Sequence, residues 1–210
     1  MIFDTYSQWG EDVIIYNILK NTGWNFSNEK GTYVDIGAND GVKYSNTNIL
    51  YKVGWRGINI EPTKNVYDRL IKNRPDDTNL NIAIYDGSNV DFYTYEMDEL
   101  NTIKEITEID KEINKKNGIE YNHKETYKVN TMKINDLFKK YNISKLELLS
   151  IDTEGLDEYI IKDIDFNKFN IKLILMESSR EKINSNIEYL YTKGYELLSI
   201  TINNLIFIKL

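Results

Sequence analysis

A short glycine-containing segment offers the first residues with readable chemistry. Residues 33–41 read YVDIGANDG: strand-forming positions, then Asp35, Gly37 and Gly41 with little that is bulky between them. In doubly wound α/β sheets, ligands bind beyond the carboxyl ends of the strands. The first strand-to-helix turn is the usual nucleotide site, because glycines let backbone amides come close to the ligand. We therefore expect a nucleotide-containing ligand at this turn.

The spacing of this segment argues against a dinucleotide. Asn39 stands where the dinucleotide fingerprint places its second glycine, against a pyrophosphate. A carboxylate such as that of Asp35 is unfavourable beside phosphates and favourable beside an ammonium group. S-adenosylmethionine has an ammonium group and no phosphate, so the pattern favours this ligand, with Asp35 and the turn against its methionine half. An ordinary glycine turn without a ligand is the alternative.

A second acid extends the predicted adenosine site. Glu61 ends the β-rich segment GINIE, 20 residues beyond Gly41, where its carboxylate can accept hydrogen bonds from both ribose hydroxyls. The tip of the third predicted strand places Ile82 and Ala83 where such folds contact adenine, although a plain core strand explains both residues equally well. Glu61 itself could be a solvated strand end.

Polar residues near these segments are further candidates for contacts with the ligand. Gln8 and Asp12, from the first predicted helix, could close over the cofactor. Ser45 and Asn46 could hydrogen-bond the methionine carboxylate or the substrate. Helix capping is the alternative for all four residues.

Three acids later in the chain could carry the chemistry. Asp152 and Glu154 follow one apolar strand and Glu177 ends the next, so their carboxylates could line one cleft. Methyl transfer from a sulfonium is an in-line displacement, and the accepting hydroxyl needs a destination for its proton. We expect Asp152 or Glu154 to act as the base. One alternative is a Mg²⁺ ion held by two of the carboxylates; the other is that Asp152 only hydrogen-bonds the cofactor or the backbone and that Glu154 is structural. His123, the single histidine, is a further candidate base, unless it is simply an exposed surface residue.

These residues need a scaffold, and hydrophobic periodicity predicts one. Strands are predicted at residues 32–36, 57–61, 80–85, 146–151, 171–176, 195–202 and 205–209, with helices near 7–20, 45–52, 63–73, 134–141 and 183–191. Because parallel strands need crossover connections, this alternation predicts a Rossmann-like doubly wound α/β fold. The two asparagines at 203–204 predict a closing hairpin that adds one antiparallel strand.

One segment departs from this pattern. Residues 100–127 balance Lys against Glu and Asp, lack apolar periodicity and are longer than ordinary loops. We expect a partly helical excursion lying over one edge of the sheet. With 210 residues and 24.7 kDa, the rest is long enough for one domain spanning residues 1–210, with the first helix as a cap.

Composition excludes several classes of function. The chain has no cysteine, which excludes disulfides and thiolate-bound metal centres. A net charge of −7 without a basic cluster disfavours nucleic acid as a partner. No apolar run approaches the roughly 18 residues of a membrane helix, and no leader-like segment starts the chain, so we expect a cytoplasmic protein without membrane insertion. The oligomeric state is not encoded in any readable pattern.

Several segments together resemble one known family. They are SQWGED (7–12), DIGANDG (35–41), SNT (45–47), GWRG (54–57), IEP (60–62) and IDTEG (151–155), with NR (73–74) and KGY (193–195) in addition. In this combination and order the chain resembles the FkbM-type family of class I methyltransferases over most of its length. Residues 100–127 match no part of the pattern.

The resemblance implies a seven-stranded Rossmann-like methyltransferase that uses S-adenosylmethionine. It further implies O-methylation of an acceptor hydroxyl on a sugar, a glycan or a small-molecule natural product. Two alternatives come from other classes. A nicotinamide-dependent oxidoreductase on a similar sheet is disfavoured by the missing phosphate-facing glycine, and a methyltransferase-like scaffold could bind ligand or partner without turnover.

Overall fold

A seven-stranded sheet forms the centre of the molecule. The computed structural model describes residues 4–103, 105–107, 111–112, 115, 118 and 120–210. The central strands are β1 (Thr32–Ile36), β2 (Arg56–Ile60), β3 (Thr78–Leu80), β7 (Lys145–Ile151), β8 (Asn170–Glu177), β9 (Tyr195–Ile200) and β10 (Asn204–Lys209). Their order is β3-β2-β1-β7-β8-β10-β9, and β10 runs antiparallel to both of its neighbours. The predicted doubly wound fold with one antiparallel strand from a C-terminal hairpin is confirmed.

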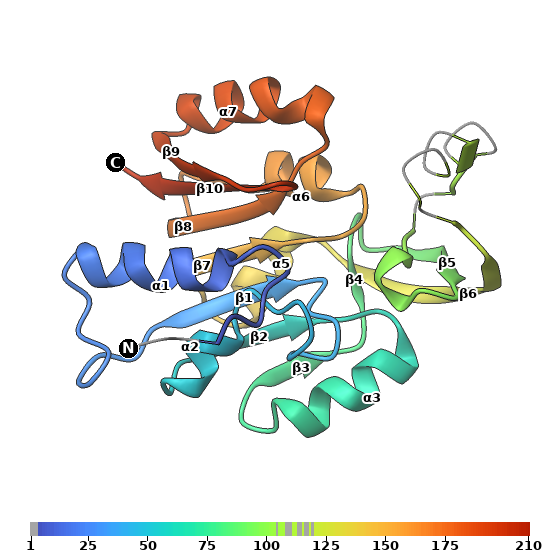
Figure 1. The fold of residues 1–210 in the computed structure, drawn as a ribbon, viewed down its shortest axis with the longest axis horizontal. Helices are drawn as coiled ribbons and strands as arrows, with labels where there is room; N and C mark the ends of the chain where they lie inside the picture. Colours follow the sequence, from blue (N-terminus) through green and yellow to red (C-terminus); the bar gives the residue numbers. More distant parts are fainter. Residues whose placement is uncertain (1–3, 104, 108–110, 113–114, 116–117, 119) are drawn as a thin grey trace.

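Helices cover both faces of this sheet (Figure 1). They are α1 (Glu11–Asn21), α2 (Asn48–Lys52), α3 (Lys64–Asn73), α5 (Ile134–Lys140), α6 (Asp157–Asp163) and α7 (Ile183–Thr192). Apolar side chains of α1 and α2 pack on one face, and those of α5, α6 and α7 pack on the other. Successive strand residues point to opposite faces. Strand β1 therefore supplies Tyr33 to the core beneath α1 and α2, and it supplies Val34 and Ile36 to the core beneath α5, α6 and α7.

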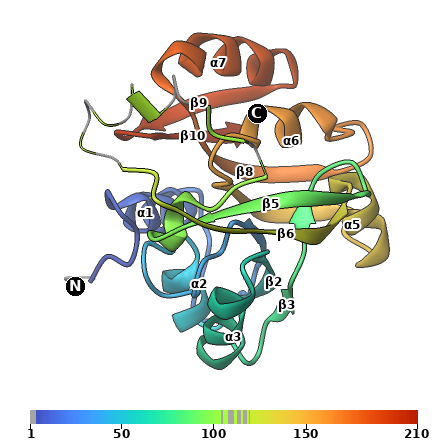
Figure 2. The same ribbon diagram turned by 90° about the vertical axis from the view of Figure 1, so that its right-hand side faces the viewer.

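A smaller sheet is inserted between β3 and α5. It consists of β4 (Ala83–Ile84), β5 (Asn89–Tyr95) and β6 (His123–Met132), in the order β4-β6-β5, with the short helix η1 (Asp98–Leu100) after β5. Figure 2 shows β5 and β6 running across the end of the molecule at which the parallel strands terminate. The insertion therefore stands over the carboxyl ends of the central strands.

The structure corrects three expected elements. The predicted strand 80–85 is two short strands, β3 and β4, that belong to different sheets. The excursion expected at 100–127 is the middle of a larger insertion, because β5 precedes it and β6 begins inside it. Its expected helical part falls largely outside the described residues. Helix α6, which carries the crossover from β7 to β8, was not predicted, and the helix expected at 45–52 begins only at Asn48.

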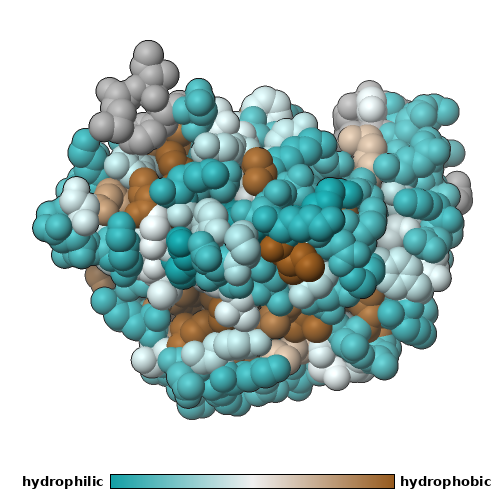
Figure 3. All heavy atoms as spheres, turned by 90° about the horizontal axis from the view of Figure 1, so that it is seen from below, coloured by the Kyte–Doolittle hydropathy of each residue, from teal (hydrophilic) through white to brown (hydrophobic). Residues whose placement is uncertain are grey.

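The face of the molecule seen from below is mostly hydrophilic (Figure 3). On this face, hydrophobic patches alternate with hydrophilic residues (Figure 3). Within the described residues, no helix combines the length and the apolar character that crossing a bilayer requires.

Candidate active site at the carboxyl ends of the central strands

A cavity of about 490 Å³ lies where the strands of the central sheet end. Strand ends supply Gly37 after β1, Glu61 after β2, Asp152 after β7 and Glu177 at the end of β8. The inserted sheet and η1 supply most of the other side, including Phe92, Leu100, Asn101 and Thr102, and Gln8 reaches the cavity from the N-terminal segment. The site is thus built by the sheet and closed by the insertion.

The turn after β1 uses its own backbone donors. The amides of Gly37 and Ala38 donate to the Ile60 carbonyl, each at 3.0 Å, and the Asn39 amide donates to Glu61 Oε2 at 3.1 Å. The next four amides, at residues 40–43, also donate to acceptors within the turn. Every amide from 37 to 43 therefore has a protein acceptor, and the turn offers no free N–H for a phosphate.

The small residues of this turn are required by the protein's own packing. Gly37 has a φ of +83°, and a Cβ there would lie 1.7 Å from the carbonyl oxygen of Asp152 on the next strand. A Cβ at Gly41 would lie 2.7 Å from Leu70 and 2.8 Å from Arg74, both on or beside α3. Packing against a neighbouring backbone and a helix therefore requires both glycines, and their predicted contact with a ligand stays a prediction.

Glu61 is buried in the wall of the cavity. Its Oε1 accepts from the Thr63 amide at 2.7 Å, and its Oε2 accepts from the Asn39 amide. Burial raises the pKa of this carboxyl to about 7, although both hydrogen bonds favour the ionised form. Each oxygen keeps a further lone pair, so the group can still accept donors from a ligand.

A buried arginine holds the loop behind the cavity. Arg74 is fully buried; its Nε donates to the Gly41 carbonyl at 2.7 Å, and its Nη2 donates to the hydroxyls of Ser45 and Thr47 at 3.0 and 3.2 Å. Its Nη1 donates to the hydroxyl of Tyr33 at 2.8 Å. These bonds tie α3 to the loop between β1 and α2.

The same loop contains residues that we had assigned to the cofactor. Asp35 is buried, and its carboxylate accepts from Thr47 Oγ1 at 2.7 Å. Burial raises the pKa of Asp35. Ser45 Oγ accepts the Asn48 amide at 3.1 Å at the start of α2, and Asn46 is buried with its Nδ2 3.5 Å from Ser150 Oγ. The hydrogen bonds of Asp35 and Ser45 therefore stabilise the loop between β1 and α2.

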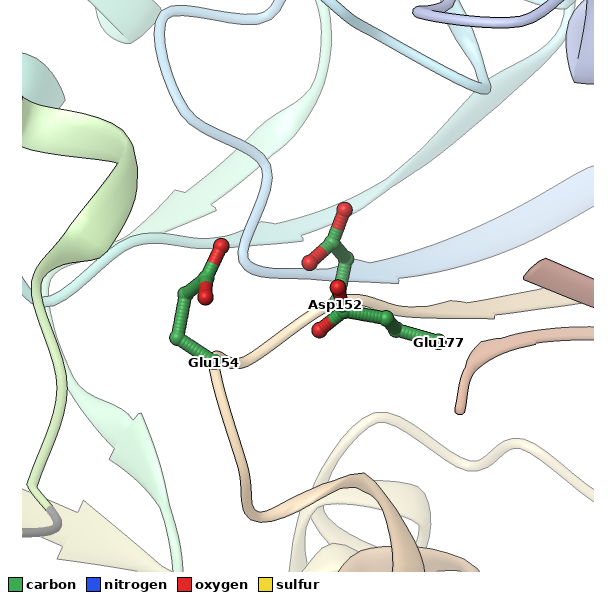
Figure 4. A group of neighbouring side chains, drawn as sticks. All are labelled: Asp152, Glu154 and Glu177. Atoms are coloured by element: carbon green, nitrogen blue, oxygen red, sulfur yellow. The ribbon is translucent and has the colours of Figure 1, made fainter. Parts of the chain in front are cut away.

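Three carboxyl groups converge beside the cavity. Asp152, Glu154 and Glu177 each offer an oxygen, and these oxygens lie within 4.8 Å of one another. Figure 4 shows Asp152 and Glu154 coming from the segment after β7 and Glu177 from the end of β8. Burial and then the charge of Asp157 raise the pKa of Asp152 to about 7, while burial and then the charge of Asp152 raise that of Glu177 to about 10.

Glu154 has an unusual backbone conformation. Its φ is +54°, in the left-handed region that non-glycine residues seldom adopt. Its carbonyl accepts from Thr102 Oγ1 at 3.0 Å, which connects the inserted segment to the end of β7. Burial, followed by the charge of Asp152, raises the pKa of Glu154 well above its ordinary value. Strain of this kind concentrates at functional sites.

The structure brings together part of the predicted site. The candidates that line the cavity are Gln8, Gly37, Asn39, Glu61, Ala83, Asp152 and Glu154. Those outside its lining are Asp35, Gly41, Ser45, Asn46, Ile82 and His123. Ile82 packs against the core that α5, α6 and α7 cover, whereas Ala83, one position further, faces the cavity. Asp12 is buried under the segment before α1, where its carboxylate accepts from Ser7 Oγ at 2.8 Å.

His123 lies away from this group. It is exposed at the start of β6, and its Nε2 is 2.8 Å from Thr126 Oγ1. The structure does not bring it to the cavity.

The contacts that join the insertion to the rest of the site were not predicted from the sequence. The Nζ of Lys43, in the loop after β1, pairs with the Glu99 carboxylate on η1, and Arg69 on α3 pairs with Asp98 at 3.0 Å. Asn101 Nδ2 donates to Thr63 Oγ1 at 3.1 Å. No sequence motif predicts these contacts, because the residues that form them are distant in sequence.

Comparisons with known proteins agree with this architecture. The family model described as "Methyltransferase FkbM domain" matches residues 35–197, most of the chain. The chain belongs to the FkbM methyltransferase family. This FkbM protein is thus an S-adenosylmethionine-dependent methyltransferase, and the resemblance drawn from its sequence is confirmed. A comparison with curated proteins gives no match.

Solved structures show the same fold for this FkbM methyltransferase. Human methyltransferase 10 domain containing protein has a TM-score of 0.52 and 10% sequence identity, with 94% of this chain and 80% of that chain covered. The N-terminal domain of human METTL16, solved in complex with SAH, has a TM-score of 0.51 and 10% identity, with 99% and 71% covered.

Proposed function

We propose that the cavity binds S-adenosylmethionine and that the enzyme transfers its methyl group to a hydroxyl of a sugar, a glycan or a small-molecule natural product. The observation that carries the proposal is the chemistry of the cavity wall. Seven consecutive amides of the β1 turn are already bonded, while the carboxyl groups of Glu61 and Asp152 border the same space. Such a wall suits a cationic nucleoside without phosphates.

The ribose, the adenine and the cationic groups of the cofactor each have a matching group in the cavity wall. Glu61, at the end of β2, accepts hydrogen bonds from the ribose hydroxyls. Ala83, Phe92 and Leu100 provide apolar surface for adenine. Asp152 offers a carboxylate to the ammonium group and the sulfonium, taking the role that we had first given to Asp35. The cavity lining supports this assignment, because it includes Asp152 and does not include Asp35.

The transfer itself requires alignment and a base. The acceptor oxygen forms a bond to the methyl carbon while the carbon–sulfur bond breaks and its electron pair stays on sulfur. The hydroxyl proton must leave at the same time, and Glu154 is the group that we assign as its acceptor. Its left-handed backbone and its anchor to Thr102 fix the carboxyl group beside Asp152 and Glu177.

A divalent cation is the alternative way to handle this proton. Asp152, Glu154 and Glu177 are the described residues that would hold it, and carboxylate oxygens suit Mg²⁺. When bound, such an ion would lower the pKa of the acceptor hydroxyl. The base remains the first choice, because it requires one ionised carboxyl group, whereas a metal site requires at least two in the same buried cluster.

Isothermal titration tests the proposed cofactor site. We expect S-adenosylmethionine to bind and NAD⁺ not to bind, because the β1 turn has no donors for a pyrophosphate. Glu61→Gln should weaken the binding of S-adenosylmethionine about tenfold or more, since it removes a charged acceptor. Glu125→Gln, an exposed residue on β6, is the matched control and should leave the affinity unchanged.

Two results would contradict the proposal. One is tight binding of NAD⁺, which would favour an oxidoreductase; the other is an unchanged affinity for S-adenosylmethionine in Glu61→Gln. Intact cofactor binding without methyl transfer to any member of a broad saccharide panel would favour a binding scaffold.

A further inference from the structure

A second cavity, of about 470 Å³, adjoins the first. The two cavities share the wall residues Tyr121, Glu154, Glu177 and Asn203. Two of the three carboxyl groups in Figure 4 therefore face both spaces. In a methyl transfer, the donor carbon, the acceptor oxygen and the base must meet at one point. If the methyl donor occupies the first cavity, the reaction belongs at this shared wall and the second cavity is open to the acceptor.

One side chain of the second cavity has an unfilled hydrogen-bonding position. Asn186, on α7, is only 2% exposed, and its Nδ2 donates to Ser178 Oγ at 3.0 Å. Its Oδ1 has no hydrogen-bond partner among the described residues. A buried oxygen without a donor destabilises the folded protein, because it has lost its hydrogen bonds to water. This oxygen is closed off from solvent, and rotation of the side chain toward the cavity would let a ligand hydroxyl supply that donor.

Only some of the charged residues that line the second cavity form ion pairs with other described residues. Lys182 Nζ pairs with Glu158 at 3.2 Å, and Glu158 also pairs with Lys162. Asp157 is engaged by the backbone, because it accepts the amide of Thr153 at 3.1 Å. Arg180, which follows β8 directly, forms no ion pair with any described residue. It is the cation of this lining that remains available to a ligand anion.

Arginine suits particular anions. Its planar guanidinium presents parallel N–H donors that match the two oxygens of a carboxylate or a phosphate. The wall around Arg180 is polar: Ser178 and Ser179 come from the segment after β8. Asn203 lies in the turn between β9 and β10, and its carbonyl accepts the Ser178 amide at 2.8 Å. The terminal hairpin therefore fixes this wall in place.

We propose that the second cavity is the acceptor subsite and that the acceptor is a polyhydroxylated molecule bearing a carboxylate or phosphate group. Arg180 binds the anion, and Asn186 Oδ1 accepts a hydrogen bond from one hydroxyl. Another hydroxyl lies at the shared wall; its oxygen takes the methyl group from the sulfonium, and its proton passes to Glu154. S-adenosylhomocysteine is the second product. The inference rests on the proposed function, because it takes the methyl donor to lie in the first cavity.

Titration of the protein loaded with S-adenosylhomocysteine tests this inference. The probes are glucose, glucuronate and glucose 6-phosphate, which share a ring and differ in charge, so that the two anions separate a carboxylate preference from a phosphate preference. We expect at least one anion to bind about tenfold or more tightly than glucose, as a charge-assisted hydrogen bond predicts. Arg180→Gln should remove that difference.

A control separates this outcome from failure of the proposed function. Arg56→Gln, at the start of β2 and outside the lining of either cavity, should preserve the preference for the anion. All variants should bind S-adenosylhomocysteine equally well; loss of that binding in the unmodified protein would instead defeat the cofactor site. The acceptor inference is overturned if the three probes bind equally, if none binds, or if Arg180→Gln retains the preference.

Discussion

Gly37 shows at the scale of one residue how packing and chemistry are joined. Its missing side chain lets the end of β1 lie against the carbonyl of Asp152 at the end of β7. The same contact brings the Asp152 amide to the Ile36 carbonyl, at 2.9 Å. The carboxyl group of Asp152 therefore reaches the cavity only because residue 37 has no Cβ.

We expect Gly37→Ala to be strongly destabilising. A Cβ at 1.7 Å from a backbone oxygen forces the two strand ends apart, and the positive φ adds about 1 kcal/mol of strain. Gly87→Ala is the matched control, because its φ is +94° and no heavy atom lies within 4 Å of the added Cβ. Urea unfolding should show a loss of about 1 kcal/mol for Gly87→Ala and at least twice that for Gly37→Ala. Equal losses would mean that backbone strain, not the contact with Asp152, requires the glycine.

A second residue-scale prediction concerns the proton. Glu154→Gln should lower kcat by about 100-fold with an acceptor that supports turnover, because it removes the base but keeps the size of the side chain. The affinity for S-adenosylmethionine should change little. For the unmodified enzyme, kcat/KM should fall as pH decreases through about 7, the pKa to which Asp152 is raised, since protonation of Asp152 weakens the cofactor site. Protonation of Glu154, whose pKa is also raised, removes the base in the same direction.

Chelation separates the base from the metal. Activity should be unchanged in EDTA. Loss of activity in EDTA and its recovery with Mg²⁺ would assign Asp152, Glu154 and Glu177 as ligands instead.

Some of the site could be predicted from single residues, and some could not. Glu61, Asp152 and Glu154 follow strands with clear apolar patterns, and parallel strands end at the same edge of a sheet, so their meeting was predictable. The role of Arg74 was not, because its partners at Gly41 and Ser45 are chosen by tertiary packing. The hydrogen bond of Asp35 to the Thr47 hydroxyl was unpredictable for the same reason, and the contact of Asp35 with the cofactor stays a prediction for a residue outside the cavity lining.

At the scale of elements, strands buried on both faces were easier to predict from the sequence than strands with an exposed part. The strands β7 and β8 are buried along almost their whole length and read as continuous apolar runs. The first half of β6 is exposed, so its HKETY sequence gives no strand signal, and its pairing with β5 went unnoticed. Helix α6 is as long as α5, but its apolar residues 159–161 are consecutive and lack the i, i+3 spacing that identified α5.

The packing of α3 against the loop after β1 supports an element-scale prediction. Arg74→Met should lower the free energy of unfolding by about 3 kcal/mol, because it leaves the fully buried Asp77 without its cation. Arg56→Met is the matched control: Arg56 pairs with Asp76 at the surface, where such a pair contributes about 1 kcal/mol or less. Chemical denaturation measures both variants. A loss for Arg74→Met no larger than for Arg56→Met would show that the loop is held by its other contacts.

At the scale of the whole molecule, the fold gathers acids at one end. The cavity borders Glu61, Asp98, Glu99, Asp152, Glu154 and Glu177, while its single described cationic side chain, Lys43, is paired with Glu99. Parallel strands with their carboxyl ends at one edge make this concentration possible. Burial raises the pKa of four of these groups, Glu61, Asp152, Glu154 and Glu177, and so opposes their ionisation.

This arrangement predicts how stability depends on pH. The pKa values of Glu61 and Asp152 are raised to about 7 and that of Asp157 to about 6, so the folded protein binds protons at these groups more tightly than the unfolded chain. Their contribution to stability is fully present below the unfolded pKa values and is lost as pH rises through about 6 to 7. The ligand-free protein should therefore melt at least about 3 °C lower at pH 8.5 than at pH 5.5. Asp152→Asn, which cannot ionise, should reduce that difference; a melting temperature that is equal at both pH values, or higher at pH 8.5, would show that these acids are not held in the buried state described.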